Sequence, residues 1–184
     1  MRRPTHRLLG RGLALALLCS AAARADAPPT EYQVKAAYLF NFGQFVEWPA
    51  QAWSSPSAPF QICLVGKDPF GTTLDDVTRG EALGGHPLMV RHIASAGEVT
   101  GCQIVFIGRS ESGRIEQTLQ TLQGRSVLTV TDVEGAENHG AMIVVRNDNK
   151  HIRMRINVAA AKASHLVISS KLLRPAEVVG NDAD

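Results

Sequence analysis

Two short apolar runs, each closed by a glycine, constrain the fold of this chain more than any other feature. Residues 60–65 precede Gly66, and residues 103–107 precede Gly108. Nearly continuous apolar runs, without strict alternation, are typical of strands buried on both faces. Such strands belong to mainly parallel sheets that carry helices on both sides. The two runs therefore predict an α/β fold.

The remaining patterns complete this fold. We expect strands over residues 60–65, 87–93, 103–107, 126–131, 141–146 and 151–156, and helices over residues 31–48, 70–79, 110–123, 158–162 and 169–178. The turn-forming residues 147–150 lie between the last two strands and predict a β-hairpin. The result is a single-domain α/β sandwich with a mainly parallel central sheet of about six strands flanked by helices. It ends in a β-hairpin and C-terminal helices.

The first 25 residues have the three parts of a secretory signal peptide. Arginines precede the apolar run 8–19, and Ala23-Arg24-Ala25 forms a small-x-small cleavage site. We therefore expect residues 1–25 to be cleaved and residues 26–184 to form one exported domain. Cleavage removes five of the 19 Lys and Arg and none of the 17 Asp and Glu, so the formal net charge changes from +2 to −3.

The basic balance of the whole chain thus comes from the predicted signal peptide. The remainder lacks the basic excess that nucleic-acid binding normally needs. No later apolar run approaches the ~20 residues of a membrane helix. We expect a soluble, exported protein without a nucleic-acid partner or direct membrane insertion. An export signal alone does not distinguish the periplasm from the medium.

Cys63 and Cys102 are the cysteines that remain, because Cys19 lies in the predicted signal peptide. In an oxidising compartment, two cysteines most simply form one disulfide. Two buried thiols and a redox pair are the alternatives, although a redox pair usually has the spacing C-x-x-C.

Signals for catalysis are poor. The sequence contains no G-x-S-x-G, H-E-x-x-H or Walker-type loop. No histidine lies at compact metal-ligand spacing from another His, Cys or carboxylate. Gly66-Lys67 could hold an anion at a helix N-terminus, but such a sequence is usually only a turn. We expect neither an enzyme nor a bound metal or cofactor.

The predicted hairpin has a cationic face. His151, Arg153 and Arg155 alternate along the second strand and therefore share a face, and a four-residue loop would set Arg146 opposite His151. Arginine suits bidentate contact with carboxylate or phosphate. This face is a candidate site for a small anion or an acidic partner surface. The alternatives are a solvated face and internal ion pairs with Glu134 and Glu137.

The first predicted helix is rich in aromatic residues. Residues 32–48 hold six of the chain's ten aromatic side chains, and Tyr38, Phe42 and Phe45 recur at spacings of four and three. One narrow stripe cannot bury all six. Either the helix is covered on several sides, or Tyr38, Phe42, Phe45 and Trp48 dock a partner.

Three segments together carry a family resemblance. They are QVKAAYLFNF with FVEWP at 33–42 and 45–49, QICLVG at 61–66, and RINV followed by ISSKLL at 155–158 and 168–173. In this combination, the chain resembles the YfiR family of exported bacterial proteins over residues 31–179.

The resemblance implies a single α/β domain, usually dimeric, that is not an enzyme. Members of this family work in the periplasm, where they bind the periplasmic sensor part of an inner-membrane diguanylate cyclase and hold it inactive. An outer-membrane lipoprotein with a peptidoglycan-binding domain can remove them, after which cyclic di-GMP and biofilm formation rise. The resemblance also implies a Cys63–Cys102 disulfide. The second cysteine pair of some members has no counterpart here.

We therefore expect a periplasmic, homodimeric repressor of a membrane diguanylate cyclase. The alternative is a periplasmic receptor that binds an anionic metabolite at Arg153 and Arg155 and reports to another membrane protein. The resemblance does not assign partner-contact residues, so the cationic hairpin and the aromatic helix are candidates from the residue pattern alone.

Overall fold

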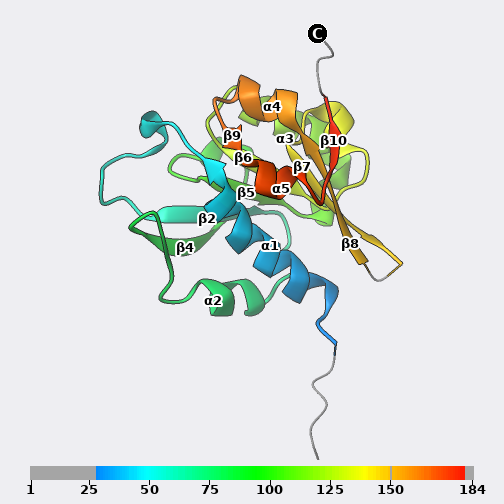
Figure 1. The fold of residues 1–184 in the computed structure, drawn as a ribbon, viewed down its shortest axis with the longest axis horizontal. Helices are drawn as coiled ribbons and strands as arrows, with labels where there is room; N and C mark the ends of the chain where they lie inside the picture. The colour runs from blue at the N-terminus through cyan, green and yellow to red at the C-terminus, as the bar shows by residue number, and fades with distance from the viewer. Residues whose placement is uncertain (1–27, 150, 181–184) are drawn as a thin grey trace, which may run out of the picture.

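A mainly parallel sheet forms the centre of the computed structural model, which describes residues 28–149 and 151–180 (Figure 1). The predicted signal peptide, residues 1–25, lies outside the described residues. The strand order is β10-β8-β7-β6-β5-β2-β4-β3. These strands are β2 (Phe60–Val65), β3 (Ala82–Leu83), β4 (His86–Ile93), β5 (Ile104–Ile107), β6 (Leu128–Thr131), β7 (Ile143–Asp148), β8 (His151–Asn157) and β10 (Glu177–Val179).

All neighbouring strands of this sheet run parallel except the pairs β7–β8 and β3–β4. The predicted mainly parallel sheet and the terminal hairpin are therefore confirmed. The sheet has eight strands instead of about six, because the short edge strands β3 and β10 join it. A separate antiparallel pair consists of β1 (Val46–Glu47) and β9 (Val167–Ile168).

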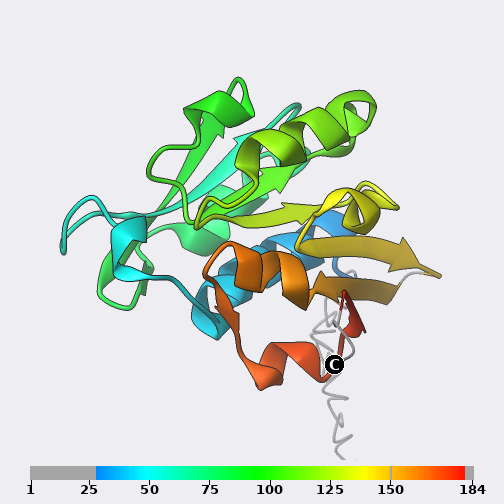
Figure 2. The ribbon, with the colours of Figure 1, turned by 90° about the horizontal axis from the view of Figure 1, so that it is seen from above.

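Helices cover both faces of the sheet. The α-helices are α1 (Glu31–Phe45), α2 (Thr73–Thr78), α3 (Ile115–Leu122), α4 (Val158–Ala163) and α5 (Ser170–Leu173). The short 3-10 helices are η1 (Ala50–Ala52), η2 (Ala96–Glu98), η3 (Arg109–Arg114) and η4 (Ala136–His139). Figure 2 shows α3 on one side of the sheet and α1, α4 and α5 on the other.

Two hydrophobic cores result, one on each face. In β2, Ile62 and Leu64 join the core under α1, whereas Cys63 and Val65 join the core under α3. All four side chains are at most 2% exposed. This burial of alternate residues on opposite faces explains why the strand has few polar residues.

The first helix ends earlier than predicted. Residues 31–48 were expected to be helical, but α1 ends at Phe45, because Val46 and Glu47 pair with Ile168 and Val167 of β9. Its start is fixed locally by a capping box in which Thr30 and Gln33 exchange hydrogen bonds.

The prediction of helix over residues 169–178 is wrong in its second half. Helix α5 ends at Leu173, and Pro175 follows two residues later. Residues 177–179 instead form β10, which pairs in parallel with Arg155, Ile156 and Asn157 of β8. Proline cannot continue the helical hydrogen-bond ladder, and the chain then completes the sheet edge.

In two other predicted helices, the α-helical part begins later than predicted. The helix expected over residues 70–79 begins at Thr73, because Asp68 Oδ1 accepts a hydrogen bond from the Phe70 N–H (2.7 Å) and forms a turn there. The helix expected over residues 110–123 starts as η3 and becomes α-helical at Ile115.

The hairpin register differs from the prediction by two residues. Arg146 lies opposite Arg153, not opposite His151, and Asp148 lies opposite His151. The strands therefore extend into the segment that was expected to form a four-residue turn. Because the difference is an even number of residues, the predicted face of each side chain is preserved.

Candidate functional site

The carboxyl ends of β2 and β5 are where a doubly wound sheet usually binds a ligand, because the chain turns to opposite sides of the sheet there. In this structure the two loops that follow these strands contact each other. The Lys67 N–H donates a hydrogen bond to Ser110 Oγ (2.8 Å), so Ser110 does not cap a helix as predicted. Gly66 has φ +89°, and a Cβ there would collide with Ser110 Oγ. The Gly66-Lys67 turn therefore does not open a helix of its own as expected, because α2 begins only at Thr73.

A buried ion pair lies next to this crevice and joins α1 to the sheet. Lys35 of α1 is 1% exposed, and its Nζ lies 2.8 Å from Oδ2 of Asp132, which follows β6. The Asp132 side chain is fully buried, and its Oδ1 has no hydrogen-bond partner within the described residues. This pair was not predicted from the sequence. Its only signal was a lysine inside an otherwise apolar helical segment.

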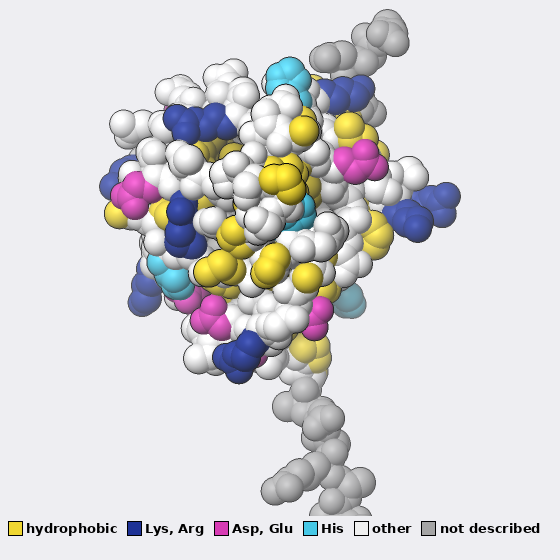
Figure 3. Space-filling view, turned by 90° about the vertical axis from the view of Figure 1, so that its left-hand side faces the viewer, with side chains coloured by type: hydrophobic (Ala, Val, Ile, Leu, Met, Phe, Trp, Pro, Cys, Tyr) yellow, Lys and Arg dark blue, Asp and Glu magenta, His cyan; other side chains and the backbone are white. Residues whose placement is uncertain are grey.

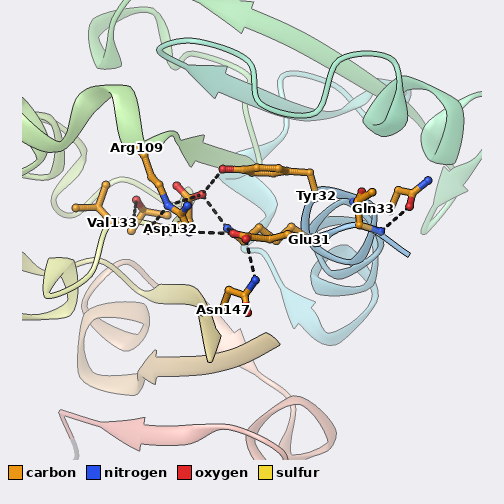
Figure 4. A network of polar contacts seen from close by, with 10 residues as sticks. Glu31, Tyr32, Gln33, Arg109, Asp132, Val133 and Asn147 are labelled. Carbon is orange, nitrogen blue, oxygen red and sulfur yellow. Dashed lines mark hydrogen bonds and ion pairs between the residues drawn. The ribbon is translucent and has the colours of Figure 1, made fainter. Parts of the chain in front are cut away.

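Four further side chains extend the ion pair into a network (Figure 4). Arg109 Nη2 lies 2.9 Å from Glu31 Oε1, and Arg109 Nε lies 3.4 Å from Asp132 Oδ2. Tyr32 donates a hydrogen bond to Asp132 Oδ2 (2.9 Å), and Asn147 donates one to Glu31 Oε2 (2.9 Å). Two cations and two carboxylates are balanced here. We therefore interpret the network as a clamp between α1, β5, β6 and β7.

The clamp changes the acidity of Glu31. Burial alone would raise the pKa of the Glu31 carboxyl group. The hydrogen bonds from Asn147 and Lys35, together with the charges of Lys35 and Arg109, outweigh this effect and lower the pKa below its ordinary value. Glu31 is therefore an anion at neutral pH and completes the charge balance of the clamp.

We expect the Tyr32 hydroxyl group to lose its proton at a pH about two units higher than that of an exposed tyrosine. Burial, followed by the hydrogen bond to the Asp132 carboxylate, raises the pKa of Tyr32 from 10.0 to about 12. The unfolded chain loses this proton first, so the stability that the group contributes is complete below pH 10 and decreases between pH 10 and 12. The difference in tyrosinate absorbance between the parent and Tyr32→Phe measures this titration. A midpoint near pH 10 would contradict the prediction.

The structure partly neutralises the predicted cationic hairpin face. Arg155 Nη1 lies 2.6 Å from Glu137 Oε1, and Arg155 Nε lies 2.9 Å from Glu177 Oε2. Arg146 Nη2 lies 3.6 Å from the same Glu177 oxygen. Of the two internal ion pairs considered from the sequence, the one with Glu137 is therefore present. Glu134 makes no ion pair among the described residues. Despite burial, the pKa of Glu137 is lowered by a backbone hydrogen bond and by Arg155.

Two other side chains of this face, those of Arg153 and His151, are exposed. Arg153 makes no ion pair within the described residues, and His151 hydrogen-bonds only to the Asn149 carbonyl (3.0 Å). Arg146, Arg153 and Arg174 line a surface hollow of about 420 Å³, together with the carboxylates of Asp148 and Glu177. We call this place the arginine hollow. Arg174 was not among the predicted site residues, because it reaches the hairpin only through the tertiary fold.

The aromatic helix contributes mainly to the core. Phe42 is 0% exposed, so its predicted contact with a partner is wrong for this conformation. Tyr38 stacks on Phe42 with ring centroids 6.0 Å apart. Trp48 donates a hydrogen bond to the Gln103 carbonyl (3.1 Å) and packs against Phe60. The helix is thus covered on several sides. Tyr38, Trp48 and the half-buried Phe45 stay candidate partner contacts that no observation tests.

Hydrophobic side chains also gather on the face that contains the loop between β1 and β2 (Figure 3). Trp53 of this loop stacks on His86 with ring centroids 3.8 Å apart and also contacts Phe60. The stacking accounts for the partial burial of Trp53 without any partner.

The two cysteines form the expected disulfide. Cys63 lies in β2 and Cys102 two residues before the start of β5, with their Cα atoms 5.9 Å apart. Both residues are buried, at 0% and 3% exposure. Arg91 Nη2 donates a hydrogen bond to Cys102 Sγ (3.2 Å). The disulfide thus links β2 to the segment that precedes the adjacent parallel strand β5, and it is part of the core under α3.

Residues 28–149 and 151–180 contain neither a cluster of metal-binding side chains nor a helix that could cross a membrane. Within these ranges, His, Cys, Asp and Glu side chains form no group of three or more that could hold a metal ion. None of the helices there has the length and apolar character needed to cross a membrane.

Comparison with known proteins identifies the family. No curated protein matches the chain. Residues 32–177, however, match the YfiR/HmsC-like family, and this range extends from α1 to the start of β10. The match therefore includes the central sheet, the disulfide and all five α-helices. This chain belongs to the YfiR/HmsC-like family.

Proposed function

We propose that this protein is an exported periplasmic regulator that represses an inner-membrane diguanylate cyclase by binding its periplasmic sensor region. Cyclic di-GMP and biofilm formation would be lowered as a result. The family match over residues 32–177 carries this proposal, because YfiR-like proteins are periplasmic regulators and not enzymes. The signal peptide predicted at residues 1–25 supports export.

Repression of this kind requires a difference in affinity. A protein that binds the inactive state of the cyclase more tightly than the active state shifts the population towards inactivity. An outer-membrane peptidoglycan-binding lipoprotein that competes for the repressor would relieve the inhibition by mass action. We also propose that the repressor is a homodimer, which sedimentation equilibrium of the mature protein would test.

Deletion of the gene should raise cellular cyclic di-GMP severalfold and increase surface attachment, because the cyclase loses its inhibitor. Mass spectrometry of nucleotide extracts measures this change. In a strain that also lacks the cognate cyclase, the deletion should have no effect. Unchanged cyclic di-GMP in the single deletion strain, with the cyclase expressed, would count against the proposed function.

The alternative function, a receptor for an anionic metabolite at Arg153 and Arg155, has weaker support. The Arg155 guanidinium already contacts the carboxylates of Glu137 and Glu177. A small anion would have to displace these internal partners, whereas a larger acidic partner could use Arg153 without doing so.

A further inference from the structure

We propose that the open edge of β8, together with the arginine hollow, is a docking site for an extended, acidic segment of a protein partner. The segment would add to the sheet as a strand and place carboxylates beside Arg153 and Arg174. This inference rests on the proposed function, in which the protein acts by binding another protein.

The edge of the sheet is only half covered. Strand β10 pairs with Arg155, Ile156 and Asn157, so no strand of the described part of the chain lies outside the earlier half of β8, residues 151–154 (Figure 1). The Asn157 N–H donates to the Met142 carbonyl (2.8 Å) and therefore points toward the β7 side. Alternation along the antiparallel ladder then directs the backbone groups of Ile152 and Met154 outward. An open strand edge of this kind is a template for strand addition.

Three arginines outnumber the two carboxylates, Asp148 and Glu177, that line the arginine hollow, and this balance favours an acidic occupant. Arg153 and Arg174 are exposed and make no ion pair within the described residues. Arg146 has only a long contact of 3.6 Å with Glu177, which Arg155 contacts at 2.9 Å. The buried Arg146 Nε has no hydrogen-bond partner in the described part of the chain. Guanidinium groups with unused donors bind carboxylates strongly and in defined geometry.

The backbone edge favours a protein segment over an anionic membrane surface. A lipid phosphate could contact the arginines, but it offers no N–H and C=O groups to pair with Ile152 and Met154. His151 and Arg153 occupy alternate positions in the open half of β8 and lie on one face. A partner strand with acidic residues at alternate positions would match them across the ladder. A competing explanation is that the arginines protect the β8 edge from unwanted strand pairing. If that is their role, an acidic strand should not bind there.

Fluorescence anisotropy with labelled peptides tests the site on the mature protein. The probe is a short peptide of alternating Glu and Val, and the controls are the Lys/Val peptide and a Glu/Val peptide with backbone N-methylation. We expect the acidic peptide to bind about tenfold or more tightly than either control. In the double variant Arg153→Glu/Arg174→Glu, affinity for the acidic peptide should fall about tenfold or more.

A matched control reverses two exposed cations at the opposite end of the strands. Arg125→Glu/Lys162→Glu should bind the acidic peptide like the parent, since Arg125 precedes β6 and Lys162 follows β8. Unchanged affinity in Arg153→Glu/Arg174→Glu would overturn the site. Equal binding of the N-methylated peptide would overturn strand addition. Binding to phosphatidylglycerol vesicles without binding to the acidic peptide would replace the protein partner with a membrane surface.

A cellular arm separates this inference from the proposed function. In the deletion strain, the parent gene should restore low cyclic di-GMP, whereas Arg153→Glu/Arg174→Glu should not, although the variant protein is folded and exported. Full repression by this variant would overturn the docking site and leave the proposed function intact. If the deletion itself leaves cyclic di-GMP unchanged, the proposed function fails regardless of how the peptides bind.

Discussion

Replacement of both Cys63 and Cys102 with alanine should lower the free energy of unfolding by about 4 kcal/mol. The disulfide joins residues that are 39 positions apart, so it restricts a long loop of the unfolded chain. It also fixes β2 beside β5 at the centre of the sheet. Urea denaturation followed by circular dichroism measures the change.

Reduction of the parent protein provides the matched control. With a reducing agent present, the parent should unfold at nearly the same urea concentration as the Cys63→Ala/Cys102→Ala variant, and the variant itself should not respond. If the oxidised parent and the variant had equal stability, the native packing around β2 and β5 would suffice without the bridge.

The single substitution Lys35→Met should lower the free energy of unfolding by about 3 kcal/mol. It keeps most of the buried apolar volume but leaves the fully buried Asp132 carboxylate without its nearest cation. Arg109 Nε, at 3.4 Å from Asp132 Oδ2, offsets only part of this loss, because the Arg109 side chain is 53% exposed. Urea denaturation at neutral pH measures the effect.

A second substitution tests whether the unpaired charge is the cause. Asp132→Asn in the Lys35→Met background removes the charge and still offers the Tyr32 hydroxyl group an acceptor. The double variant should recover more than half of the lost stability, because a neutral pair avoids the cost of a buried, unpaired ion. If it were less stable than Lys35→Met, the hydrogen bonds of Asp132 and not its charge would hold α1 on the sheet.

Several parts of the fold follow from local patterns. The apolar runs at β2 and β5 predicted the parallel sheet, because each residue in such a strand faces one of two cores. Alternation along β8 predicted that Arg153 and Arg155 share a face, and this held although the register was wrong by two residues. The disulfide was also expected, from the cysteine count and from the family resemblance.

Other parts depend on contacts between distant segments. Residues 46–47 and 177–179 continue helical patterns in the sequence, yet they are strands, because β9 and β8 offer them backbone partners. Tertiary pairing overrides a local preference for helix when it satisfies backbone groups at the edge of a sheet.

The candidate sites also depend partly on local sequence patterns and partly on contacts between distant segments. The sequence alone specified the arginines of the hairpin and the aromatic side chains of α1. It also indicated the family to which the chain belongs. The tertiary structure decided which of these groups have partners: Glu137 and Glu177 neutralise Arg155, the core buries Phe42, and Lys35 pairs with Asp132 from 97 positions away. Sequence periodicity reports the face on which a side chain lies. The energy of a charged group depends on its neighbours in space, and only the folded chain brings those neighbours together.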